Sequence, residues 1–145
     1  MTAAEYVVEL LGGTGTFKGR TPRTAGEMRE HIERGLPYRS FESVRERLQL
    51  TVPEAVKVLR LPARTLARRR EARKLGADES DRLVRLARIA AHAATVFGSE
   101  EKAAAWLHRP NRALHGEIPI DLLDTDVGVR QIEDVLGRIG HGVVG

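Results

Sequence analysis

The chain has 145 residues, 41% hydrophobic and 30% charged, so it can bury a core and is neither disordered nor fibrous by composition. It contains no cysteine, which excludes disulfides and thiolate metal sites and suits a reducing compartment. The net charge of +4 is uneven: residues 41–92 hold 13 basic and 7 acidic side chains (+6), whereas residues 93–145 hold 5 and 8 (−3), which indicates two surfaces with different partners.

The composition also favours helices. Only 4% of the residues are aromatic, and strands draw on aromatic and β-branched side chains. The N-terminal residues lack the basic region and the apolar run of a signal peptide, and no later segment has eighteen uncharged apolar residues. We therefore expect a soluble, all-α protein of the cytoplasm that makes no membrane contact.

Residues 1–40 predict a short N-terminal segment, a loop and one helix. Residues 12–22 contain too many glycines for a regular element, so we expect a flexible loop there. The glycines do not complete the spacing of a phosphate-binding loop. A helix is predicted from Ala25 to Arg34, ended by Gly35 and then by Pro37.

The basic middle predicts a helix-turn-helix over residues 41–78. Ser40 is predicted to cap a helix that carries Phe41, Val44 and Leu48 at helical spacing. Thr51 and Glu54 form a capping box, which predicts a helix over 52–59. After a three-residue turn, helical composition resumes and stops at Gly76. The turn holds Arg60 where glycine is usual, a position that often requires a positive φ.

The second helix of this unit would enter the major groove. Arginine suits that role because its fork binds guanine O6 and N7 together. Such units usually dimerise to cover two half-sites, so we expect a homodimer, with the apolar helix over 83–97 as its candidate interface. The alternative is a solvated basic face on which Glu71 serves as an ion-pair partner. The predicted DNA-binding residues are Arg64, Thr65, Arg68, Arg69, Arg70 and Arg73.

The remaining residues predict a second helical unit, 79–145, that begins with a linking helix over 79–97. Asp78 is predicted to cap the linking helix and Gly98 to end it. Ser99 is predicted to cap the next helix, which Pro110 breaks. A short helical turn is expected over 119–123, and Asp124 or Thr125 opens a final helix with its apolar residues on one face.

No catalytic or metal site is predicted. The chain has five histidines, but His108 and His115 lie seven residues apart across a proline-containing loop without a third ligand at regular spacing. Neither a serine elbow nor a cysteine nucleophile is present. We therefore expect a protein that is not an enzyme and that needs no cofactor.

The C-terminal fifty residues resemble the toxin-binding domain of Xre-type antitoxins. Similar domains share a series of short motifs in a fixed order, and core composition alone would not produce matching loops. The matching residues here are Phe97-Gly98, Trp106-Leu107, Pro110-Asn111, Leu114, Gly116, Pro119, Leu122-Leu123, Thr125, Gly128, Leu136, Arg138-Ile139 and Gly142.

The resemblance implies an inhibitor of a RES-domain toxin that attacks NAD. It implies that the tail covers the entrance to the toxin's NAD site, with its C-terminal end nearest that entrance, and that the helix-turn-helix binds operator DNA and represses the operon of both genes. The alternative is a stand-alone helix-turn-helix regulator whose tail dimerises or senses a ligand. The predicted toxin contacts are Glu133, Asp134, Arg138, His141, Val143, Val144 and Gly145.

Overall fold

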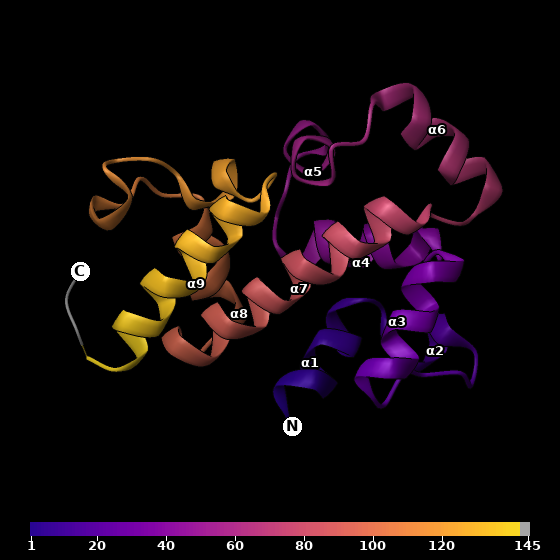
Figure 1. The fold of residues 1–145 in the computed structure, drawn as a ribbon, viewed down its shortest axis with the longest axis horizontal. Coiled ribbons are helices and arrows are strands. Elements are labelled where there is room, and N and C mark those ends of the chain that lie inside the picture. Colours follow the sequence, from indigo (N-terminus) through magenta and orange to yellow (C-terminus); the bar gives the residue numbers. More distant parts are fainter. Residues whose placement is uncertain (143–145) are drawn as a thin grey trace.

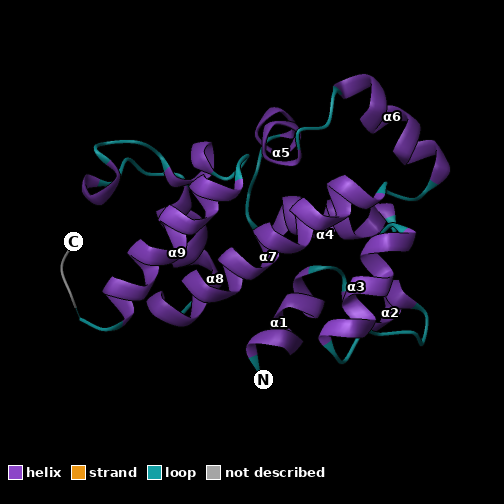
Figure 2. Ribbon diagram, viewed as in Figure 1, coloured by secondary structure: helices purple, strands orange, loops and turns teal. Residues whose placement is uncertain are grey.

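A computed structural model of the chain describes residues 1–142, which form an all-helical molecule, as the composition predicts. Figure 1 traces the chain, and Figure 2 shows helices from one end of the molecule to the other. The elements are α1 (Ala3–Leu10), α2 (Gly13–Phe17), α3 (Ala25–Arg34), α4 (Tyr38–Arg47), α5 (Val52–Leu59), α6 (Ala63–Ala72), α7 (Ala77–Phe97), α8 (Glu100–Leu107), the 3-10 helices η1 (Arg112–Leu114) and η2 (Pro119–Leu122), and α9 (Asp126–Gly140).

The long helix α7 organises the fold. It packs against α1, α3, α4 and α5 on one side of the chain's midpoint and against α8 and α9 on the other. Leu83, Leu86 and Ile89 recur at helical spacing and are each at most 2% exposed, because neighbouring helices cover them along the helix. One continuous hydrophobic core therefore runs through the molecule, with α7 along its axis.

The N-terminal segment differs from the prediction. The expected loop over 12–22 contains the helix α2, so a loop throughout this segment is wrong. The Thr16 hydroxyl donates to the Gly12 carbonyl, and Phe17 is buried with its ring edge-on to His31, at 5.1 Å between ring centroids. Gly12, at φ 111°, allows the sharp turn from α1 into α2. Tertiary packing of one aromatic side chain thus overrides the low helix propensity of glycine.

Two predicted caps are also wrong. The helix α4 begins after Pro37, and Ser40 is buried in its first turn, with its amide donating to the Pro37 carbonyl. The helix α7 begins after Gly76, and the Glu79 carboxylate, rather than Asp78, accepts the hydrogen bond from the Gly76 amide. In both places a backbone group two or more residues earlier begins the helix.

Other boundaries are confirmed. The helix α3 spans the predicted residues and ends at Gly35. The capping box of Thr51 and Glu54 begins α5. Ser99 caps α8, and Thr125 caps α9 by accepting a hydrogen bond from the Gly128 amide.

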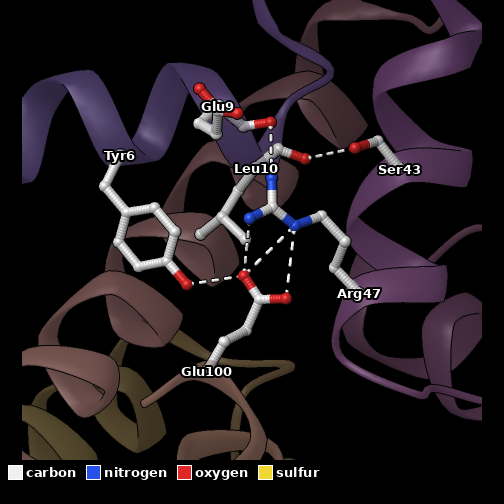
Figure 3. A network of polar contacts seen from close by, with 6 residues as sticks. All are labelled: Tyr6, Glu9, Leu10, Ser43, Arg47 and Glu100. Carbon is white, nitrogen blue, oxygen red and sulfur yellow. Dashed lines mark hydrogen bonds and ion pairs between the residues drawn. The ribbon is translucent and has the colours of Figure 1, made fainter. Parts of the chain in front are cut away.

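A polar network joins α1, α4 and α8 (Figure 3). The Tyr6 hydroxyl donates to the Glu100 carboxylate at 2.6 Å, and the Arg47 guanidinium contacts the same carboxylate at 2.7 Å. Arg47 also donates to the Glu9 carbonyl at 2.9 Å. Burial and the Glu100 carboxylate raise the pKa of Tyr6 to about 12, so the phenol remains a donor at neutral pH.

The structure gives one further constraint on the class of protein. Over residues 1–142, no helix has both the length and the apolar character that a membrane crossing requires.

Candidate nucleic-acid interface and candidate partner-binding helix

The turn between α5 and α6 has the geometry expected of a helix-turn-helix. Arg60 adopts the left-handed conformation at φ 51°, as the turn position requires, at a cost of roughly 1–2 kcal/mol for a non-glycine residue. Its amide donates to the Lys57 carbonyl, and the next residue, Leu61, is only 3% exposed. The turn is therefore held by backbone hydrogen bonds and by one buried leucine.

The helix α6 lies at the periphery of the molecule. None of its residues is buried, and Leu66 is its one large apolar side chain, packed partly against the core. Figure 1 shows α6 at the outer edge, beyond α7. A helix that buries so little apolar surface leaves most of its circumference available to a partner.

The arginines of α6 divide between two faces. Arg64 and Arg68 are exposed on the outer face, one turn apart. Arg70 and Arg73 are also exposed, and the Arg73 carbonyl accepts a hydrogen bond from the Tyr38 amide. The inner face carries Thr65, Leu66 and Arg69, which are the half-buried residues of the helix.

Arg69 differs from the other arginines because it forms an ion pair. Its Nε contacts the carboxylate of Glu79, which is buried at the start of α7. Burial opposes ionisation of Glu79, but hydrogen bonds from the Gly76 amide and from Arg69 outweigh burial and hold the pKa of Glu79 below its usual range. The prediction from sequence missed this pair, since residues ten apart are brought together only by the turn between α6 and α7.

The helix α9 is strongly two-sided. Its apolar residues Val129, Ile132, Val135 and Leu136 are buried against the rest of the tail. Gly128 fits closely against η2: a Cβ atom there would lie 1.7 Å from the Leu122 carbonyl oxygen. The structure thus fixes both the rotation of α9 and its distance from η2.

The outer face of α9 carries the predicted partner contacts. Glu133, Asp134 and Arg138 are exposed along the helix, and His141 is exposed at its C-terminal end. Val143, Val144 and Gly145 lie outside the described residues.

Three ion pairs connect the helix-turn-helix and α7 to the tail, and sequence reasoning did not find them. Within the described residues, Lys57 of α5 lies 3.8 Å from Asp121 of η2, and His108 lies 3.5 Å from the Glu54 carboxylate. Arg85 of α7 lies 3.6 Å from Asp126 at the start of α9. No sequence signal marks these pairs, because they depend on how α5 packs against η2 and how α7 packs against α9.

The described residues show no metal centre. No group of three or more histidine, aspartate or glutamate side chains among residues 1–142 lies close enough together to hold a metal ion.

Two family models match the chain. The model described as the antitoxin Xre-like helix-turn-helix domain matches residues 27–88. The model described as the antitoxin Xre/MbcA/ParS C-terminal toxin-binding domain matches residues 92–142. The first range includes α5 and α6, and the second includes α8 and α9.

Curated relatives resemble the chain over most of their length. A protein named Antitoxin Xre from Pseudomonas putida is 38% identical over 117 residues, which cover 80% of this chain and 72% of the relative. Antitoxin Xre from Photorhabdus laumondii is 32% identical over 115 residues, 78% of each chain. Antitoxin Xre from Yersinia enterocolitica is 29% identical over 116 residues, which cover 79% of this chain and 78% of the relative.

Proposed function

The chain belongs to the Xre family of antitoxins, with a helix-turn-helix domain and a C-terminal toxin-binding domain, and from this premise we propose that it inhibits a RES-domain toxin that degrades NAD and represses its own operon. The family implies a toxin and DNA as partners. The proposal adds the class of toxin, the covering of its active site and the regulation of both genes. It treats residues 1–40, 41–78 and 79–145 as the N-terminal, DNA-binding and toxin-binding parts.

The exposed face of α9 is the observation that carries the toxin-binding proposal. Glu133, Asp134 and Arg138 are exposed, while the apolar side of the same helix is fully used by the core. A pocket that admits NAD must attract phosphates and is therefore basic, and residues 93–145 carry a net charge of −3. This acidic unit is a suitable electrostatic partner for such a pocket.

The C-terminal end is proposed as the part nearest the toxin's active site. His141 ends α9, and the sequence continues with Gly142, Val143, Val144 and Gly145. These side chains are small and apolar, so they suit a narrow cleft, and the chain ends in a free carboxylate that complements a basic entrance.

The helix α6 is proposed as the recognition helix of a DNA-binding homodimer. Its N-terminal and outer residues would reach bases and phosphates, whereas a single unit would bind weakly. The proposed contacts on the exposed surface are Arg64, Thr65, Arg68, Arg70 and Arg73.

The two proposed surfaces lie far apart. Figure 1 shows α6 and the C-terminal end of α9 at opposite ends of the long axis of the molecule. A toxin on α9 and DNA on α6 would therefore not compete for the same residues.

A co-expression experiment tests the proposal. The chain is expressed with the neighbouring open reading frame and purified through a tag on this protein, and NAD consumption by the partner is measured before and after the two are separated. We expect a stable complex whose partner consumes NAD only when freed, and truncation inward from Gly145 should restore consumption within the complex. A partner that does not consume NAD when freed would refute the proposed class of toxin.

A further inference from the structure

The recognition helix needs an orienting contact, because its own apolar packing is slight. It has no buried residue, and Leu66 is its one large apolar contact with the core. Major-groove recognition depends on helix orientation within small tolerances, so polar contacts that fix α6 against the body would decide how well it fits.

The contacts that fix α6 lie at its C-terminal end. The Tyr38 amide donates to the Arg73 carbonyl at 3.1 Å, and the Leu75 amide donates to the Leu36 carbonyl at 2.8 Å. These backbone bonds attach the segment after α6 to the segment before α4. They leave the rotation of α6 about its own axis to side-chain contacts.

The ion pair of Arg69 with Glu79 supplies such a contact. Thr65, Leu66 and Arg69 lie on one face of α6, one turn apart, and Arg69 reaches the Glu79 carboxylate at the N-terminus of α7. The Glu79 side chain is only 8% exposed, whereas that of Arg69 is 35% exposed. A buried carboxylate of this kind is fixed in place, so it holds α6 against the helix that organises the fold.

Gly76 makes room for this pair. A Cβ atom at Gly76 would lie 2.9 Å from the Arg69 Nη2 atom and 2.9 Å from a Glu79 carboxylate oxygen. The φ of Gly76 is −79°, which any residue can adopt, so the close approach of the pair, rather than backbone strain, requires glycine here.

We infer that Arg69 is a positioning residue of the recognition helix, oriented by its ion pair with Glu79, and that it does not itself contact DNA. The inference rests on the proposed DNA-binding function. It separates Arg69 from the neighbouring arginines, with which composition alone groups it.

The two roles predict different salt dependence. An arginine that neutralises a phosphate releases counterions, so its loss reduces the slope of log affinity against log salt by about 1. A positioning residue can weaken binding to the preferred sequence while the number of phosphate contacts, and therefore the slope, is unchanged.

The test measures binding of the full-length protein to the duplex upstream of its own gene, by fluorescence anisotropy over a range of salt concentrations. The variants are Arg69→Ala, Glu79→Gln and their double variant, and Arg64→Ala on the outer face is the matched control. Glutamine at position 79 retains an acceptor for the Gly76 amide but removes the charge that holds Arg69. Circular dichroism at the assay temperature selects conditions in which every variant is folded.

We expect Arg69→Ala and Glu79→Gln each to weaken binding about tenfold with an unchanged slope, and the double variant to be no weaker than either single one, as for partners in one network. Arg64→Ala should reduce the slope. A reduced slope for Arg69→Ala, or tighter binding by Glu79→Gln through a released arginine, would overturn the inference. A wild-type protein that does not prefer the upstream duplex to a shuffled one would refute operator binding itself and the inference with it, a result distinct from either variant outcome.

Discussion

At the scale of single residues, Glu100 has an effect on stability that depends on pH. Burial opposes ionisation of its carboxyl, but hydrogen bonds from Arg47 and Tyr6 outweigh burial and hold the pKa of Glu100 below its usual value of 4.5. Since the folded-state pKa is lowered, the stabilisation is complete above pH 4.5 and is lost as the pH falls through the folded-state pKa.

We therefore predict that Glu100→Gln lowers the free energy of unfolding at pH 7 by about 1–2 kcal/mol, the value of a charge-assisted hydrogen bond. Urea denaturation from pH 7 down to pH 3 should show this difference shrinking towards zero. Glu101→Gln is the matched control, because Glu101 is exposed in the same first turn of α8 and experiences the same helix dipole. A difference that stays constant with pH would contradict the role given to the carboxylate.

Arg60 carries a second prediction at this scale. Its left-handed backbone costs about 1 kcal/mol that glycine would not incur, and its side chain is exposed. Arg60→Gly should therefore raise the melting temperature. Arg64→Gly, inside α6, should lower it, because glycine in a helix interior costs about 1 kcal/mol. Equal shifts for the two variants would show that backbone conformation does not decide the effect.

At the scale of elements, the glycines of α9 differ in what they permit. Gly128 faces the Leu122 carbonyl oxygen at a distance that admits no Cβ atom, whereas Gly137 has no heavy atom within 4 Å of its Cβ position. Gly128→Ala should destabilise the protein by about 2 kcal/mol or more, since α9 must move away from η2. Gly137→Ala should stabilise it by up to about 1 kcal/mol. Thermal unfolding of the free protein measures both changes.

The sequence predicted those elements whose signals are local. The capping box of Thr51 and Glu54 is complete within four residues, and it begins α5 as expected. The helix α2 escaped prediction because its stability comes from the contact of Phe17 with His31, fourteen residues away. Sequence alone likewise could not assign Arg69, because its partner Glu79 is set by the rotation of α6 relative to α7. Local chemistry thus located the basic helix, but packing determined which of its arginines are free to meet a ligand.

At the scale of the whole molecule, the continuous core joins the DNA-binding and toxin-binding parts. Buried residues of the headgroup such as Val44 and of the tail such as Leu107 belong to one hydrophobic cluster along α7. The Glu100 network and the Lys57–Asp121 pair cross the same junction. Neither part can lose its packing without exposing apolar surface of the other.

We therefore predict a single cooperative unfolding transition for the free protein, with the calorimetric enthalpy equal to the van't Hoff enthalpy. Val44→Ala and Leu107→Ala should each lower the melting temperature of that one transition, because both deletions leave cavities in the same core. Differential scanning calorimetry distinguishes this outcome from two transitions that respond separately to the two variants. Two such transitions would show that the headgroup and the tail unfold independently. A single transition would instead make α7 a route by which toxin binding on α9 can change the stability of the DNA-binding unit.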